Sequence, residues 1–359
     1  MLKIYTYQIP FVTPFKIAQG SYSTREGIIL CYEEDGLTAY GEIAPLTGFS
    51  AFTIQNIIPI LEQEYENISE WLSTNDDDFL LNFEVKYPIP SLLFGLGTLV
   101  ADYHAKKKNQ TLQHYLHPTA TQTLVPANAA IGIQADSDSI LADVSKKVEQ
   151  GFDTIKLKVG LNFEHEFQAI QAIRTSYKDV KLRLDANRSW GYNDASKYLN
   201  LLAPYDIEYI EEPLLLKDRH LWGRLKQASE IKIAADESFR NKKDALELID
   251  QNLVDLLILK PMMFGRFSEM GVTIELANSH DIDIVFTTSL ESVVGRTATA
   301  VLSSIWGSKK YDHGISTGTL LEDDLADTVH EMEGGRFKLP NQNGLGILIN
   351  TEKLNLVIG

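Results

Sequence analysis

The sequence predicts an α/β barrel joined to a smaller α+β domain, and three observations indicate this fold class. The chain has 359 residues, whereas a single α/β barrel commonly takes about 250. Residues 1–120 are typical of antiparallel strands followed by helices. From about residue 124 onward, short apolar runs alternate with helical stretches, as they do in consecutive β-α units.

The smaller domain is predicted over residues 1–120. Strand-like runs at 3–8, 27–33 and 38–43 indicate an antiparallel sheet. Between residues 51 and 116 the apolar spacing becomes helical. The tail, residues 319–359, is expected to return to this domain and complete it.

The barrel is predicted over residues 121–318. Eight short apolar runs suggest a closed ring of parallel strands, and the last run is the weakest. These runs lie near 125–132, 153–159, 180–186, 207–211, 231–236, 254–260, 282–288 and 311–315.

Composition excludes several classes of protein. With 33 Lys and Arg against 49 Asp and Glu, the net charge of −16 argues against a nucleic-acid partner. The single cysteine, Cys31, cannot form an intramolecular disulfide and indicates a reducing compartment, by default the cytoplasm. No apolar run approaches the roughly 20 residues that span a bilayer, so we expect a soluble protein without a membrane partner. The sequence does not define an oligomeric state.

Polar residues occur inside strands that should be almost wholly apolar. In the run 155–159 the period of two places Lys156 and Lys158 on one face. Taken alone, this pattern also fits an edge strand with a solvated lysine face. The next strand repeats it, because Arg183, Asp185 and Asn187 share one face. The repetition favours lysines that point into the barrel.

Ionisable residues then end the following strands at Glu211, Asp236 and Lys260. From Lys158 to Lys260 these positions recur every 24–27 residues, which is one β-α unit each time. Because the C-terminal ends of barrel strands meet at one mouth, the spacing predicts a single site. Three carboxylates there, Asp185, Glu211 and Asp236, repel one another unless a cation lies between them, and an all-oxygen set suits Mg²⁺ or Mn²⁺ better than zinc.

Lysines flank this acidic trio on both sides. A partly buried lysine beside a metal has a lowered pKa and can accept a proton near neutral pH. The arrangement predicts abstraction of the α-proton of a small carboxylate substrate. The alternative is a barrel that binds ligands without catalysis, but unpaired inward charges are costly without a compensating ion or role.

These motifs resemble the enolase superfamily, in its muconate-lactonizing-enzyme-like subgroup. The resemblance implies a capping domain and a modified TIM barrel of (β/α)7β type. The likeness is strongest to the o-succinylbenzoate synthase family. The likeness to the synthase family rests on 41–50, 182–190 and 287–292. The resemblance to the superfamily rests on Lys156-Leu157-Lys158, Asp185-Ala186-Asn187, Glu211-Glu212-Pro213, Asp236-Glu237-Ser238 and Lys260-Pro261.

The resemblance implies a role for each member of the site. Asp185, Glu211 and Asp236 would hold Mg²⁺, and Lys158 would remove the α-proton to give an enediolate and then protonate the leaving hydroxyl. Lys260 would stay cationic on the opposite face. The implied reaction is syn dehydration of 2-succinyl-6-hydroxy-2,4-cyclohexadiene-1-carboxylate to 2-succinylbenzoate, a step of menaquinone biosynthesis.

Supporting roles are expected for further residues. Lys156 would lower the pKa of Lys158 and touch the substrate carboxylate, and Arg183 and Asn187 would orient the metal ligands. Glu212 and Glu237 are expected to be structural, because alternation points them the other way. Loops 15–25 and 46–51 would form lids. The remaining candidates are Thr287, Thr288 and Ser289 for substrate binding and Gly20, Gly48 and Phe49 in the lids.

A second reaction fits the same metal and lysines. An N-succinylamino acid racemase or a dipeptide epimerase would exchange protons through both lysines. Dipeptide epimerases of this subgroup carry a paired-aspartate motif after the eighth strand, where this chain has one aspartate, Asp312. The difference argues against the epimerase and leaves the racemase open.

Overall fold

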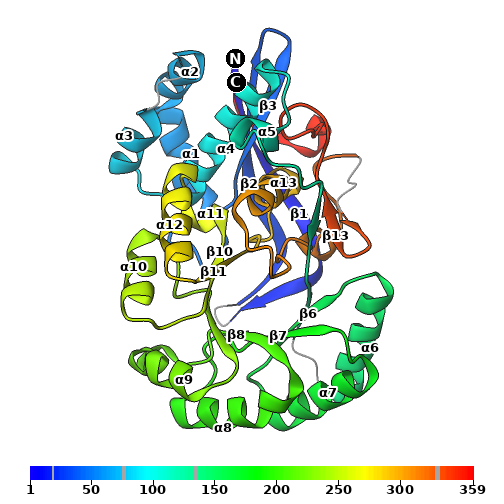
Figure 1. Cartoon of the computed structure of the whole chain (residues 1–359). Helices are drawn as coiled ribbons and strands as arrows, with labels where there is room; N and C mark the ends of the chain where they lie inside the picture. Colours follow the sequence, from blue (N-terminus) through cyan, green and yellow to red (C-terminus); the bar gives the residue numbers. More distant parts are fainter. Residues whose placement is uncertain (18–19, 75–77, 133–135, 328–331) are drawn as a thin grey trace.

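The computed structural model describes residues 1–17, 20–74, 78–132, 136–327 and 332–359. It contains an antiparallel sheet with its own helices and, next to it, a curved parallel sheet surrounded by helices (Figure 1). Both chain ends lie together at the far end of the antiparallel sheet. This is the predicted mixed α/β architecture, and the predicted fold class is confirmed.

The smaller unit, called the cap below, is built on the sheet order β14-β1-β2-β3. Its predicted strands are present, but β1 and β2 extend much further than the apolar runs indicated. Leu2, Ile4, Ile28 and Leu30 alternate inward and pack on Leu96 of the long helix α4. The elements are β1 (Leu2–Ile17), β2 (Gly20–Glu34), β3 (Leu37–Ile43), α1 (Ile54–Gln63), α2 (Tyr65–Thr74), α3 (Phe79–Lys86), α4 (Pro90–Lys107), α5 (Leu112–Leu116) and β14 (Asn355–Ile358).

The barrel has seven parallel strands in the order β11-β10-β9-β8-β7-β6-β5. Most predicted runs coincide with strands, except that the first run divides into β4 and β5. The seven strands are β5 (Ala129–Ile131), β6 (Thr154–Lys158), β7 (Lys181–Asp185), β8 (Ile207–Glu211), β9 (Lys232–Ala235), β10 (Leu256–Leu259) and β11 (Asp283–Phe286), and β4 (Leu124–Pro126) lies in a separate small sheet. β4 pairs with β13 (Arg336–Lys338), which also pairs with β12 (Met332–Glu333).

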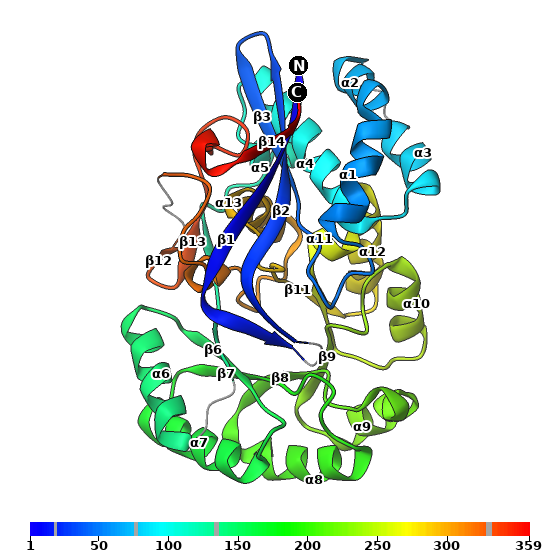
Figure 2. The same ribbon diagram turned by 180° about the vertical axis from the view of Figure 1, so that it is seen from behind.

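Helices follow the strands and cover the outside of the sheet (Figures 1 and 2). Asn162, Asn241 and Ser292 cap three of them, each accepting a backbone N–H from the first turn. The helices are α6 (Ser137–Glu149), α7 (Phe163–Ser176), α8 (Tyr192–Leu202), α9 (Trp222–Ala228), α10 (Lys242–Asp250), α11 (Pro261–Phe264), α12 (Phe267–Ser279) and α13 (Val293–Trp306). In the described part of the chain, no helix combines the length and apolar character that a membrane crossing requires.

The predicted eighth strand is reduced to two bridging residues. His313 forms a parallel bridge with Ala127, and Gly314 forms one with Thr287. His313 N–H donates to the Pro126 carbonyl at 2.9 Å, while Gly314 N–H donates to the Phe286 carbonyl at 2.8 Å. One short segment therefore links the two edges of the seven-stranded sheet without becoming a regular strand.

The β1–β2 hairpin brings the cap to the barrel mouth. In Figure 2 it runs from the chain ends down to the strand ends near β8 and β9. The segment 15–25, expected to be a loop, instead continues this hairpin, with Phe15 paired to Tyr22 and Ile17 to Gly20. Residues 18 and 19 lie outside the described residues. The described part of 15–25 is therefore a strand pair and not the predicted loop.

Candidate metal and proton-transfer site

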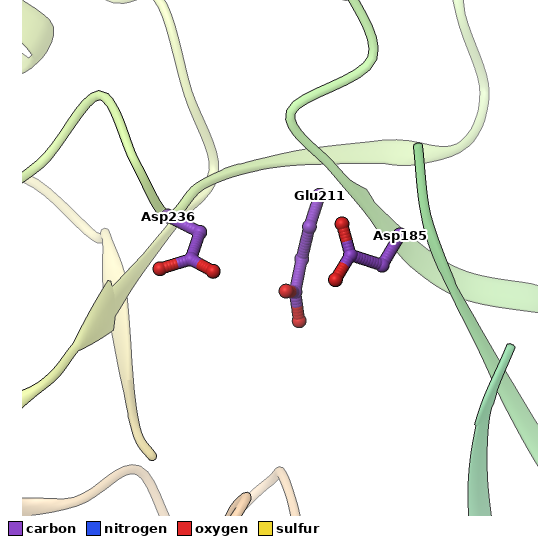
Figure 3. A group of neighbouring side chains, drawn as sticks. All are labelled: Asp185, Glu211 and Asp236. Atoms are coloured by element: carbon purple, nitrogen blue, oxygen red, sulfur yellow. The ribbon is translucent and has the colours of Figure 1, made fainter. Parts of the chain in front are cut away.

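Three carboxylates meet at the C-terminal ends of neighbouring barrel strands. Asp185 ends β7, Glu211 ends β8 and Asp236 follows β9. All three are buried, and one oxygen from each lies within 4.8 Å of the others. Figure 3 shows the side chains directed into a common space. The donor set is all oxygen, which fits a hard divalent cation.

The strand period explains this convergence. Tyr209, Ala234 and Ile258 belong to the cluster that fills the barrel interior. Each lies two residues before Glu211, Asp236 or Lys260, so alternation sends those later side chains inward as well. The ionisable residues therefore form the layer above the apolar interior, on the mouth side.

Two lysines bind the carboxylates directly. Lys156 Nζ lies 2.8 Å from Glu211 Oε2 and 3.3 Å from Asp185 Oδ2, and Lys260 Nζ donates to Asp236 Oδ1. Burial lowers the pKa of Lys156, but Glu211 and Asp185 outweigh it and hold the pKa well above its usual value. Burial also lowers the pKa of Lys260, and Asp236 and Glu237 reverse that effect.

The carboxylates respond unequally to the same surroundings. Burial raises the pKa of Glu211 to about 7, against the opposing charge of Lys156. Burial also acts on Asp185, yet the ammonium groups of Lys156 and Lys158 outweigh it and lower the pKa. The trio thus carries negative charge at a place that favours a bound cation.

Lys158 differs from its two neighbours. It ends β6 in register with Asp185 and is half-buried. Among the described residues, its ammonium makes no hydrogen bond or ion pair, although its charge reaches Asp185. The structure therefore holds two paired lysines, Lys156 and Lys260, and one lysine whose amine is available to a ligand at the mouth.

Glu212 and Glu237 lie next to members of the trio in the sequence, and both were expected to be structural. Only Glu212 has that role. Glu212 is buried and accepts the N–H groups of Asp236 and Ser238 at 3.0 and 2.7 Å, which is the expected structural part. Glu237 faces the site, so the alternation argument was wrong for it. β9 ends at Ala235, and Glu237 is already the second residue beyond that end, where the extended backbone that alternation requires no longer continues.

Glu237 lines a small cavity with Asp236, Lys260 and Phe49. Asn187 Nδ2 donates to its Oε1 at 2.9 Å. Burial, followed by the charge of Asp236, raises the pKa of Glu237 to about 7. Sequence reasoning missed this residue, and the signal that could have found it was the end of the apolar run at Ala235.

The two residues expected to orient the carboxylates lie at different depths. Asn187 is next to the site, and its backbone N–H donates to Asp185 Oδ1 at 3.1 Å. Arg183 lies deeper and is fully buried. Its described hydrogen bonds go to Glu208 at 2.7 Å, Asn128 at 3.2 Å and the Asp312 carbonyl at 2.5 Å, rather than to the trio.

The hydroxyl groups after β11 are mostly occupied. Thr287 and Thr288 both donate to the Gly314 carbonyl, at 3.0 and 3.2 Å, and so help to close the barrel. Ser289 is buried, and its hydroxyl has no hydrogen-bond partner among the described residues. Of the three candidates, Ser289 has the free donor.

The lid residues are spread over the cap. Gly20 begins β2 at the hairpin end. Gly48, at a φ of +83°, lies at the exposed turn of the 46–51 loop, a conformation that glycine adopts without strain. Phe49 turns inward beside Asp236 and Lys260. The structure thus brings Phe49, but not Gly48, to the carboxylate site.

A buried polar junction between cap and barrel was not predicted. Glu42, at 0% exposure on β3, accepts the N–H groups of Ser292 and Gly295 at the start of α13, at 2.9 and 2.7 Å. Glu291 is also fully buried. Burial, and after it the negative charge of Glu42, raises the pKa of Glu291 to about 7. No short-range pattern links Glu42 to residues some 250 positions away, so the sequence alone carried no signal for this contact.

Comparisons with known proteins agree with this architecture. Residues 139–353 match the family described as enolase C-terminal domain-like, and residues 1–103 match the N-terminal domain of MenC. An o-succinylbenzoate synthase from Listeria innocua is 24% identical over 97% of this chain and 92% of its own length. A hydrophobic dipeptide epimerase from Enterococcus faecalis is 30% identical over 81% of this chain and 82% of its own length.

A solved structure shows the same fold. The N-succinyl Arg/Lys racemase from Bacillus cereus superposes with a TM-score of 0.82 at 21% identity, covering 99% of this chain and 98% of that chain. The enolase C-terminal match alone spans more than half of the present sequence. The chain therefore belongs to the enolase superfamily.

Proposed function

We propose that this protein is an o-succinylbenzoate synthase, which dehydrates 2-succinyl-6-hydroxy-2,4-cyclohexadiene-1-carboxylate to 2-succinylbenzoate in menaquinone biosynthesis. The observation that carries the proposal is the division among the lysines. Lys158 has a free amine, while Lys156 and Lys260 are held as cations by carboxylates. One base and one opposing cation are what a one-sided elimination needs.

The proposed cofactor is Mg²⁺, with Mn²⁺ as an alternative. Asp185, Glu211 and Asp236 would hold the ion, and their buried oxygens, within 4.8 Å of one another, suit it. When bound, it supplies positive charge that acidifies the α-proton of a substrate carboxylate and offsets the charge that develops when this proton leaves.

The chain's own residues account for the proton movements. The Lys158 amine takes the proton from the carboxylate-bearing ring carbon, and the C–H electrons pass into the substrate carboxylate as an enediolate. They then form the new ring double bond as the hydroxyl leaves. The resulting Lys158 ammonium gives its proton to that hydroxyl, so water departs from the same face and the amine is regenerated. Lys260, on the other side, offsets the transient negative charge, and Lys156 adds a second fixed cation beside the carboxylates.

The position of Asp312 argues against a dipeptide epimerase. Its carboxylate accepts the Thr154 hydroxyl at 2.7 Å. Thr154 begins β6, whereas Lys158 ends it at the mouth. Asp312 is therefore tied at the opposite end of the barrel, away from any ammonium of a substrate at the mouth. The match of residues 1–103 to the MenC N-terminal domain also supports the synthase.

An N-succinylamino acid racemase is the second candidate. Lys158 ends β6 and Lys260 directly follows β10, on either side of the trio, and a racemase needs a proton-exchanging group on each face of the substrate. Against it, Lys260 is tied to Asp236 and its pKa is raised. The proposal accordingly assigns Lys260 an electrostatic role.

A substrate panel tests the proposal. Purified protein with Mg²⁺ is incubated with the cyclohexadiene and, in D₂O, with N-succinylamino acids and dipeptides. We expect rapid aromatisation and slow or absent α-deuteration of the amino acid substrates. Fast α-deuteration without aromatisation would replace the synthase with a racemase or epimerase, and no turnover of any substrate would remove the enzymatic assignment.

The domain division also remains a proposal. Residues 1–120, completed by 319–359, would form the cap, and 121–318 the catalytic barrel. The pairing of β14 with β1 supports a cap assembled from both chain ends.

A further inference from the structure

The 46–51 loop begins at a deeply buried anchor. Arg25 on β2 is 3% exposed, and its guanidinium donates to five backbone carbonyls, which uses all five of its N–H groups. Two acceptors, Ala44 and Pro45, immediately precede the loop, and two more, Ser289 and Leu290, follow β11. The fifth is Glu26. This end of the loop is fixed to both cap and barrel.

The attachment of the loop itself to the barrel is much lighter. Arg240, half-buried between β9 and α10, donates from Nη1 to the Phe49 carbonyl at 3.1 Å. Its Nε donates to the Glu237 carbonyl at 3.2 Å. Among the described residues, no other hydrogen bond joins residues 46–51 to the barrel. A single guanidinium thus connects the loop to the backbone beside Asp236.

The backbone of Arg240 is held in place by hydrogen bonds at the start of α10. Its backbone N–H donates to Asp244 Oδ2 at 3.0 Å, and the Asp244 N–H donates to Asn241 Oδ1 at 3.0 Å. These bonds tie the Arg240 backbone to the start of α10. The barrel side of the contact is therefore held by more hydrogen bonds than the loop side.

Phe49 is the part of the loop that meets the site. Its side chain lines the small cavity with Asp236, Glu237 and Lys260, while Thr47 and Gly48 are exposed. Internal bonds from the Phe49 and Ser50 N–H groups to the Leu46 carbonyl, at 3.0 and 2.8 Å, make the loop a compact turn. Release of the Phe49 carbonyl would let this turn move away from the barrel as one piece.

We propose that Arg240 is a positioning residue that latches the 46–51 loop closed over the carboxylate site. This inference rests on the proposed function, since it gives the loop a role in binding that substrate. The guanidinium bridges the Phe49 carbonyl of the loop and the Glu237 carbonyl of the barrel. The closed loop is therefore held in a fixed position next to Asp236. Opening the latch exposes the site for substrate entry, and closing it places Phe49 beside the ligand.

Arginine suits this task better than lysine. Its planar fork reaches two carbonyls at once, whereas a lysine ammonium acts as a point charge. Arg240→Lys should keep one contact, and Arg240→Gln should lose most of the latch. The expected order of loop closure is wild type, then R240K, then R240Q.

Limited proteolysis tests the latch without any substrate. Chymotrypsin cleavage after Phe49, followed by mass spectrometry of the fragments, measures how often the loop opens. We expect about tenfold faster cleavage in R240Q, as for loss of one charged hydrogen bond, with R240K intermediate. Arg224→Gln, at an exposed arginine on α9, is the matched control and should cleave like wild type. Circular dichroism verifies folding. If R240Q does not fold, the cleavage rate of R240K is compared with that of wild type instead.

Steady-state kinetics then distinguishes a role of Arg240 in loop closure from a role in supporting the structure of the carboxylate site. When only a fraction of molecules is closed, apparent affinity falls by that fraction. R240Q should raise KM about tenfold, with kcat within about twofold of wild type. The Mg²⁺ concentration for half-maximal rate should not change.

Two results would overturn the latch. The first is wild-type cleavage after Phe49 in both R240Q and R240K. The second is a fall in kcat with altered Mg²⁺ dependence and unchanged KM, because Arg240 would then act on the Asp236 strand end. Should the protein not dehydrate the cyclohexadiene, the proposed function fails, and the proteolysis result still decides whether Arg240 holds the loop.

Discussion

At the scale of single residues, the barrel mouth separates three lysines by their contacts. Lys156 and Lys260 are bound to carboxylates that raise their pKa, and Lys158 is left without such a partner among the described residues. The sequence placed all three at one mouth but expected a lowered pKa near the metal carboxylates. Burial does lower the lysine pKa, but the adjacent carboxylates act more strongly. Pairing, which no spacing rule reveals, therefore distinguishes the lysine that we propose as the base from the two paired cations.

Glu291 gives a residue-level prediction about stability and pH. Its pKa rises from 4.5 to about 7 on folding, so the folded protein binds this proton more tightly than the unfolded chain. The resulting stabilisation is complete below about pH 4.5 and is lost as the pH rises through 7. Relative to wild type, Glu291→Gln should gain up to about 3 kcal/mol of unfolding free energy between acidic and mildly alkaline pH.

Urea unfolding of both proteins from about pH 4 to pH 8 measures this difference, which isolates Glu291 from every other titrating group. Parallel stability curves for wild type and Glu291→Gln would show that the Glu291 carboxyl is not perturbed on folding.

At the scale of elements, the predictable part of the site is the part set by strand period. Asp185, Glu211, Asp236 and Lys260 were found because each continues an inward-facing alternation to the last residue of its strand or to the residue directly after it. The prediction failed at Glu237, where the strand had already ended, and at 15–25, where a predicted loop is the β1–β2 hairpin. Local patterns do not determine where a strand stops when tertiary contacts extend or cut it.

The junction of β3 with α13 gives an element-level prediction. Glu42 accepts three hydrogen bonds from Ser292 and Gly295 and another from the Tyr7 hydroxyl. Glu42→Ala leaves these buried donors at the start of α13 without a partner, so we expect a loss of about 3 kcal/mol of unfolding free energy.

Urea denaturation measures the loss, with Glu275→Ala on the exposed face of α12 as the control. An unchanged midpoint for Glu42→Ala would mean that the cap docks without this contact.

At the scale of the whole molecule, both chain ends build the cap, and the cap's β1–β2 hairpin and 46–51 loop reach the barrel mouth. β14 joins β1 in the cap, the hairpin reaches the strand ends, and Arg25 ties cap and barrel together. The general plan of barrel and smaller domain followed from composition and periodicity. The junction itself did not, because contacts such as Arg25 with Leu290 join residues 265 positions apart.

Metal binding should stabilise the whole protein. At a Mg²⁺ concentration one hundred times its dissociation constant, a single site that binds only the folded state adds about 2.7 kcal/mol of unfolding free energy. Thermal melting in EDTA and in Mg²⁺ measures this gain for wild type and for Asp236→Asn. An equal gain in Asp236→Asn would place the ion elsewhere.

The most direct test of the central claim is the rate of 2-succinylbenzoate formation by wild type and Lys158→Ala, followed by absorbance in saturating Mg²⁺. We predict turnover by wild type and a loss of about 10²–10⁴-fold or more in Lys158→Ala, since the base is removed. Lys181→Ala, at an exposed lysine on β7, should match wild type. A Lys158→Ala rate within tenfold of wild type, or no aromatisation by wild type, would contradict the account.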